Sequence, residues 1–179
     1  MTLLNKKCMV VVLVSLLTNL PLYADCSAHT CDFGPTIPCE QLLYNNSFNN
    51  EDCDAWVSSN VDIVTEPAAY ASFSGSSSAF LYQTVMVPTG YTAHDIFVTV
   101  DVSGSSNTAA LYVEVRSTTG ILLQTFDILS TGSADDTYQY GPPAEVYEGQ
   151  AVRIQFRYVP GANPSNAEFK ITNVDFFVT

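Results

Sequence analysis

The sequence has little positive charge and no long apolar run. Six lysines and arginines stand against 18 acidic residues among 179, which gives a formal net charge of −12. Binding nucleic-acid phosphates requires clustered Lys and Arg, so nucleic acid is excluded as a partner, and anionic lipid is disfavoured for the same reason. The apolar run at residues 8–17 is about half the length needed to cross a bilayer, so membrane insertion is not expected.

Signals of catalysis are also missing. The chain has two histidines, His29 and His94. It contains no Gly-x-Ser-x-Gly elbow, metal-binding His pair or phosphate-cradling loop. Asp135 and Asp136 are adjacent in sequence, so on a strand their side chains would point to opposite faces. We therefore expect a protein that is not an enzyme.

The first 24 residues have the pattern of a signal peptide. Lys6 and Lys7 precede the apolar run, Pro21 ends it, and Ala24 offers a small residue at a cleavage site. Residues 1–24 therefore predict export to an extracellular or periplasmic location. Without this segment, four basic residues face 18 acidic ones, a net charge near −14.

Four cysteines follow the signal peptide within a short stretch: Cys26, Cys31, Cys39 and Cys53. An even number of cysteines in an exported chain predicts two disulfides, with three pairings open. The alternative is a zinc site, because His29 lies between Cys26 and Cys31, but zinc sites favour Cys-x-x-Cys pairs and reduced thiolates. We expect residues 25–40 to form an irregular Cys-rich lead-in that disulfides staple to the following domain.

From residue 41 to residue 179 the sequence alternates between apolar and polar side chains, in short runs separated by turn residues. The clearest alternation places these apolar side chains on one face of three runs: Ile96, Val98, Val100, Val102, Leu111, Val113, Val115, Val152, Ile154, Phe156 and Tyr158. This pattern predicts eight or nine strands, including 41–48, 56–64 and 169–178. We expect one all-β domain, an antiparallel two-sheet β-sandwich with a shared apolar core.

The order of several short motifs is similar to that of a known family. The motifs are Asn45-Asn46-Ser47-Phe48-Asn49, Trp56, Leu81-Tyr82-Gln83-Thr84-Val85, Pro88-x-Gly90 and Phe169-Lys170-Ile171-Thr172-Asn173-Val174. They resemble the galactose-binding-like jelly rolls, in particular the carbohydrate-binding modules attached to xylanases and other polysaccharide-degrading enzymes. Those modules begin Asn-Gly-x-Phe-Glu, carry Tyr-Gln-x-Val before a Pro-x-Gly turn, and close on Ile-Asp-Asp-Val. The resemblance covers residues 41–179 and implies a jelly roll with Trp56 in its core.

The resemblance also raises the question of a structural calcium ion. In such modules the acidic residues of the opening and closing motifs often help to hold calcium, but Asn49 and Thr172 stand at those positions here. Calcium prefers several anionic oxygens, so these replacements imply a weak site or none. The weak metal candidates are Asn49, Glu51, Asp52 and Asp175, and the alternative is a solvated acidic loop. No other cofactor is expected.

Two of the predicted strands carry polar and aromatic side chains on their outward faces. Sugar binding uses flat aromatic rings and planar polar groups that hydrogen-bond hydroxyls in pairs. If the strand around 112–116 and the strand around 153–157 lie in one sheet, their outward side chains form a binding platform. The alternative is that the arginines make ordinary surface ion pairs. Tyr140, beside Gly141-Pro142-Pro143, is a further candidate for stacking from a loop. The candidate ligand-binding residues are Tyr112, Glu114, Arg116, Arg153, Gln155, Arg157 and Tyr140.

Two functional hypotheses follow. The first is a secreted, non-catalytic carbohydrate-binding protein that holds a glycan or extracellular polysaccharide by aromatic stacking and hydrogen bonds. The second is an extracellular structural or adhesive protein that assembles into a surface layer or filament. It rests on the cysteine staple and on the apolar last strand, where Val174, Phe176, Phe177 and Val178 could support pairing with the sheet edge of a neighbour.

Overall fold

A computed structural model of the protein describes residues 40–49, 55–91, 94–104, 108–141, 146–162 and 167–179. Within these residues the chain forms eleven β-strands in two antiparallel sheets. No helix in the described part is long and apolar enough to span a membrane. The cysteines of the predicted staple, Cys26, Cys31, Cys39 and Cys53, lie outside the described residues, so the disulfides stay a prediction.

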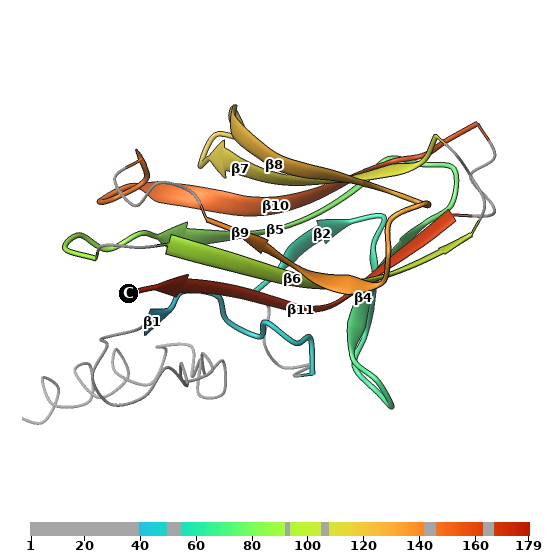
Figure 1. Cartoon of the computed structure of the whole chain (residues 1–179), viewed down its shortest axis with the longest axis horizontal. Coiled ribbons are helices and arrows are strands. Elements are labelled where there is room, and N and C mark those ends of the chain that lie inside the picture. Colours follow the sequence, from blue (N-terminus) through green and yellow to red (C-terminus); the bar gives the residue numbers. More distant parts are fainter. Residues whose placement is uncertain (1–39, 50–54, 92–93, 105–107, 142–145, 163–166) are drawn as a thin grey trace, which may run out of the picture.

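The strands are divided between a six-stranded and a five-stranded sheet. The six-stranded sheet has the order β3 (Asp62–Val64), β4 (Tyr70–Ser74), β11 (Ala167–Val178), β6 (His94–Gly104) and β9 (Asp136–Tyr140), and β1 (Glu40–Gln41) also pairs with β11. The five-stranded sheet has the order β2 (Val57–Ser59), β5 (Ala79–Met86), β10 (Ala151–Val159), β7 (Ala110–Ser117) and β8 (Leu122–Ser130). In Figure 1 the five-stranded sheet is the upper layer and the six-stranded sheet is the lower layer.

The core lies between the two layers. Successive side chains of a strand point to opposite faces, so alternate apolar residues of each sheet meet in the interior. Val98 and Val113 are fully buried, and Ile154 is 1% exposed. Burying a large apolar side chain contributes about 1.5–3 kcal/mol. The predicted all-β antiparallel sandwich is confirmed, and its interior includes all the apolar positions that the alternation identified except Val102, which is only partly buried.

The predicted strand at 56–64 is two strands that belong to different sheets. Val57–Ser59 (β2) pairs with β5, whereas Asp62–Val64 (β3) pairs with β4. Asn60 lies between them with a φ of 56°. Asn adopts this left-handed conformation more readily than most residues, so the chain can turn there and cross from one layer to the other.

The predicted first strand at 41–48 is much shorter than expected. Regular pairing stops at Gln41, and Asn45 and Phe48 both have positive φ. The irregular segment still packs: Phe48 is fully buried, and its ring lies 5.4 Å from that of Trp56. The Trp56 indole N–H donates to the Asn45 carbonyl at 3.0 Å. Trp56 is therefore a core residue, as the resemblance implied.

The last strand, β11, does not lie at an edge. It pairs with β6 along one side and with β4 and β1 along the other. Val174, Phe176 and Val178 are fully buried in the core. The expectation that this strand offers itself to a neighbouring sheet is therefore wrong, because both of its sides are already paired. Self-association through other sheet edges stays a prediction.

Candidate functional site

The register between β7 and β10 brings six of the seven candidate residues together. In this antiparallel pair Arg153 lies opposite Arg116, Gln155 opposite Glu114, and Arg157 opposite Tyr112. The residues between them along both strands, such as Val113 and Ile154, are buried in the core. These six side chains therefore lie on the outer face of the five-stranded sheet. The condition that both strands share one sheet is met.

Strand β5 adds two aromatic residues to this face that are not among the seven candidates. Phe80 lies opposite Arg157, and Tyr82 lies opposite Gln155. Their rings are stacked with centroids 6.0 Å apart. The signal was present in the sequence as the alternation of buried Leu81 and Val85 with outward Phe80 and Tyr82. We call the outer surface formed by these residues the arginine face: Phe80, Tyr82, Tyr112, Glu114, Arg116, Arg153, Gln155 and Arg157.

Glu114 lies at the centre of the arginine face and is fully buried beneath its neighbours. Its Oε2 accepts a hydrogen bond from Arg116 Nε at 2.7 Å, and its Oε1 accepts from Arg157 Nη2 at 2.8 Å and Nε at 3.0 Å. Burial alone would raise the pKa of this carboxyl, but the hydrogen bonds and charges of Arg157 and Arg116 hold the pKa below its ordinary value. The carboxylate is therefore ionised and fixes two guanidinium groups.

Two guanidinium groups of the arginine face lie over aromatic rings. The Arg157 guanidinium carbon is 4.0 Å from the centre of the Tyr112 ring, and that of Arg153 is 4.4 Å from the centre of the Tyr82 ring. Both distances are well within the range of cation–π attraction. The face thus presents planar hydrogen-bond donors stacked on aromatic rings, a combination suited to ligands with paired oxygen atoms.

The turn between β7 and β8 holds two of the arginines from one end of the face. Arg116 Nη1 donates to the Gly120 carbonyl at 2.8 Å, and Arg153 Nη2 donates to the Thr118 carbonyl. Gly120 has a φ of 88°, a left-handed conformation that glycine adopts without strain. The turn therefore fixes both guanidinium groups before any ligand arrives.

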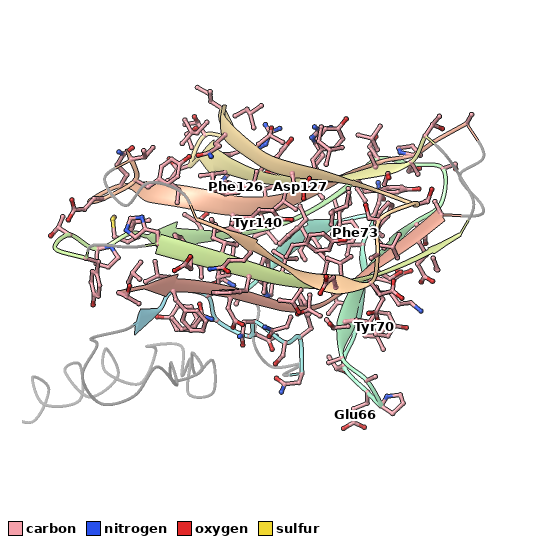
Figure 2. All side chains as sticks on the ribbon, viewed as in Figure 1. Glu66, Tyr70, Phe73, Phe126, Asp127 and Tyr140 are labelled. Atoms are coloured by element: carbon pink, nitrogen blue, oxygen red, sulfur yellow. The ribbon has the colours of Figure 1, made fainter. Side chains whose placement is uncertain are left out.

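Tyr140 lies apart from the arginine face. It belongs to β9 in the six-stranded sheet, where it pairs with Ile96, whose side chain is fully buried. Its hydroxyl donates to Asp127 Oδ2 at 3.1 Å, and its ring stacks on Phe126 with centroids 5.7 Å apart. Burial, together with the charge of Asp127, raises the pKa of Tyr140 far above its ordinary value. Figure 2 shows the three residues where β8 and β9 approach each other, so Tyr140 joins the edges of the two sheets.

The metal candidates are only partly described. Glu51 and Asp52 lie outside the described residues, and Asn49 is exposed. The carboxylate of Asp175 accepts hydrogen bonds from the side-chain amides of Gln41 at 2.7 Å, Asn46 at 2.5 Å and Asn173 at 2.6 Å. Among the residues that the structure describes, no group of three His, Cys, Asp or Glu is arranged to hold a metal ion. A calcium site stays a prediction.

The fold of this chain is similar to those of solved structures, although no known protein matches it in sequence comparisons with protein families and curated proteins. No family model matches the sequence, and no curated protein matches it. A solved structure of a family 61 carbohydrate-binding module in complex with β-1,4-galactotriose superposes with a TM-score of 0.57 at 13% identity, covering 78% of this chain and 99% of that one.

Two further solved structures have the same fold over most of this chain. The C-terminal family 22 carbohydrate-binding module of a Clostridium thermocellum xylanase has a TM-score of 0.50 at 11% identity, covering 76% of this chain and 92% of the module. An arabinose-bound α-L-arabinofuranosidase has a TM-score of 0.51 at 16% identity, covering 77% of this chain but 26% of the enzyme. The chain therefore has the jelly-roll fold of the carbohydrate-binding modules.

Proposed function

We propose that the chain is an exported, non-catalytic carbohydrate-binding protein that holds a glycan on the arginine face. The observation that carries this proposal is the register of β7 and β10, which gathers Tyr112, Arg116, Arg153, Gln155 and Arg157 on one outer surface. The likeness to a module in complex with a galactotriose supports it. The signal-peptide pattern of residues 1–24 supports export.

The chemistry of the arginine face suits a sugar chain. Guanidinium and amide groups are planar and can donate two hydrogen bonds to neighbouring hydroxyls, while aromatic rings pack against the apolar C–H face of a pyranose. Phe80 is 37% exposed, so its ring is open to such a contact. A shallow polar surface gains little on desolvation, and we expect dissociation constants of roughly micromolar to millimolar.

A pair of double variants tests this proposal. Tyr112→Ala with Arg153→Ala removes one ring and one guanidinium from the arginine face. The matched control is Tyr70→Ala with Lys170→Ala on the six-stranded sheet, where the Lys170 amino group lies 5.2 Å from the centre of the Tyr70 ring. The ligand is first found on a glycan array, and its affinity is then measured by calorimetry.

We expect the first double variant to lose at least about tenfold in affinity, since two contact groups are removed. The control should bind as the wild type does, and both variants should keep cooperative thermal unfolding. Equal affinity of the wild type and the Tyr112/Arg153 variant would refute a site on the arginine face.

A further inference from the structure

The charges of the two sheets are distributed unequally. The strands of the six-stranded sheet carry seven acidic residues, namely Glu40, Asp62, Asp95, Asp101, Asp136, Glu168 and Asp175, against the single base Lys170. The strands of the five-stranded sheet carry three arginines against Glu114 and Asp127. Asp127 lies opposite the buried Val113 and hydrogen-bonds Tyr140 from the other sheet, so it does not belong to the arginine face.

The arginine face therefore has a positive surplus in a strongly acidic protein. Of its three guanidinium groups, those of Arg116 and Arg157 share the single carboxylate of Glu114. In the part of the chain that the structure describes, Arg153 takes part in no ion pair. The chain has 18 acidic residues that could pair with Arg153. That none of those in the described residues does so indicates that its charge is available to a ligand.

The position of Arg153 strengthens this point. It lies directly opposite Arg116 in the antiparallel pair of β10 and β7, so their Cβ atoms are about 5 Å apart, and like charges in this arrangement repel. Arg153 Nε is buried without a hydrogen-bond partner among the described residues. An anion placed between the two guanidinium groups would remove the repulsion and could accept hydrogen bonds from both.

The surroundings hold this pair in place. Thr118 and Gly120 in the β7–β8 turn accept hydrogen bonds from Arg153 and Arg116, and the Tyr82 ring lies beneath the Arg153 guanidinium. A ligand that binds here does not have to order two long side chains, which would otherwise weaken its affinity. We call the guanidinium groups of Arg116 and Arg153 together the anion seat.

We infer that the glycan held on the arginine face is anionic, and that one of its carboxylate or sulfate groups binds in the anion seat. This inference rests on the function proposed above and adds the substrate class. An oxyanion has the geometry for paired hydrogen bonds from a guanidinium group. The neighbouring rings of Tyr82 and Phe80, stacked with centroids 6.0 Å apart, would contact the sugar ring that carries the anionic group.

The experiment compares polymers that share a backbone and differ in whether they carry anionic groups. Polygalacturonate and its fully methyl-esterified form have the same backbone, so the difference in affinity reports the carboxylates. Dextran sulfate against dextran does the same for sulfate, and a neutral galactan serves as a further uncharged probe. Each is tested by calorimetry on the full mature chain at low salt and at about 1 M NaCl, where the screening length is about 3 Å.

We expect polygalacturonate, dextran sulfate or both to bind at least about tenfold more tightly than the uncharged counterpart, and this preference to shrink at high salt. Arg153→Gln should lose about tenfold in affinity for the charged polymer and clearly less for the uncharged one, because the Gln side chain keeps a hydrogen-bond donor but carries no charge. The matched control is Lys170→Gln on the opposite sheet, which removes the same charge from the chain and should retain the preference.

The outcomes separate the inference from the function on which it rests. Equal or tighter binding of the neutral polymers refutes the anion seat and leaves a neutral-glycan site in place. Binding of no polysaccharide at all refutes the proposed function itself. A preference for charge that Arg153→Gln leaves unchanged places the anionic site elsewhere and overturns this assignment. The protein could also self-associate in a concentration-dependent way that Arg153→Gln abolishes. In that case the anion seat binds the acidic six-stranded sheet of a second copy, and the inference of an anionic glycan is overturned.

Discussion

The buried carboxylate of Glu114 gives the sharpest test of the arginine face. Glu114→Gln keeps the shape of the side chain but removes its charge. In the wild type this fully buried carboxylate receives three hydrogen bonds from two guanidinium groups, at 2.7, 2.8 and 3.0 Å. The variant leaves Arg116 and Arg157 without a counter-charge among the described residues.

The magnitude follows from how well water can reach the two arginines. Breaking a buried ion pair costs about 3–5 kcal/mol when the remaining charge has no access to solvent. The Arg116 and Arg157 side chains are 19% and 33% exposed, so both can be partly hydrated once the carboxylate is gone. The amide oxygen of the introduced Gln still accepts one hydrogen bond. We therefore expect a loss of about 2–3 kcal/mol in the free energy of unfolding at pH 7, or a melting temperature lower by about 6 °C.

The effect should depend on pH in a defined direction. The folded state lowers the pKa of Glu114 below its ordinary value of 4.5. Its contribution to stability is therefore fully present above pH 4.5 and is lost as the pH falls through the lowered pKa, where the wild-type carboxylate becomes protonated. Urea denaturation at a series of pH values should show the curves of wild type and Glu114→Gln converging on the acid side.

The control is the same substitution in an ion pair whose carboxylate is half-exposed. Glu168 lies 3.4 Å from the Lys170 amino group, and both side chains are 35% exposed. Glu168→Gln should change stability by about 0.5 kcal/mol or less, because ion pairs open to solvent contribute little and the Gln side-chain oxygen can still accept the hydrogen bond of the Ser72 hydroxyl. If Glu114→Gln is no more costly than Glu168→Gln at pH 7, the reasoning about a central buried carboxylate is wrong.

Two further predictions concern the core. His94 is 2% exposed and neither ring nitrogen has a hydrogen-bond partner among the described residues, and burial lowers its pKa below the ordinary value of 6.5. Just below pH 6.5 only the unfolded state takes up this proton, so the free energy of unfolding decreases as the pH is lowered. His94→Leu should remove this part of the pH dependence and stabilise the protein by about 1 kcal/mol. An equal loss of stability in both proteins between pH 7.5 and pH 5.5, measured by urea denaturation, would count against this reasoning. Trp56, the only tryptophan, is 9% exposed, so its fluorescence should be blue-shifted and shielded from iodide, and Trp56→Ala should cost about 3–5 kcal/mol; emission typical of a solvated indole would contradict this packing.

The sandwich could be predicted because its signal is local. Val98, Val113 and Ile154 alternate with polar residues along their own strands, and a period of two identifies the buried face whatever the pairing. The division of 56–64 into β2 and β3 could not be read in this way. It depends on one left-handed residue, Asn60, and asparagine in a strand-like sequence does not by itself mark a change of sheet.

Strand β9 was also missed, for a different reason. Asp136–Tyr140 is mostly polar and forms an edge strand, whose pairing with β6 is a long-range contact that leaves little trace in its own sequence. Its Tyr138 and Tyr140 face Val98 and Ile96 across the pair, so the apolar signal comes from the neighbouring strand. The sequence alone therefore favours a loop position for Tyr140, beside Gly141-Pro142-Pro143, whereas the residue lies on a paired strand.

The candidate site was predictable in its members but not in its arrangement. The period of two places Tyr112, Glu114 and Arg116 on one face of their strand. It likewise places Arg153 and Arg157 on one face of theirs, but it does not show that the two strands are neighbours. Their register decides that two arginines lie opposite each other and that Glu114 reaches Arg157 across the strands. The alternation in β5 indicates that Phe80 and Tyr82 face outward, but nothing in its sequence identifies β10 as its neighbour.

The interior position of β11 has a consequence for how the protein is made. During synthesis β4 and β6 are complete long before residues 167–178 leave the ribosome, yet each must wait for β11 to fill the place beside it. Contacts between segments so distant along the chain form late and slowly. The nascent polypeptide is thus expected to stay without its native six-stranded sheet until residues 167–178 are available, and then to complete this sheet in one cooperative step.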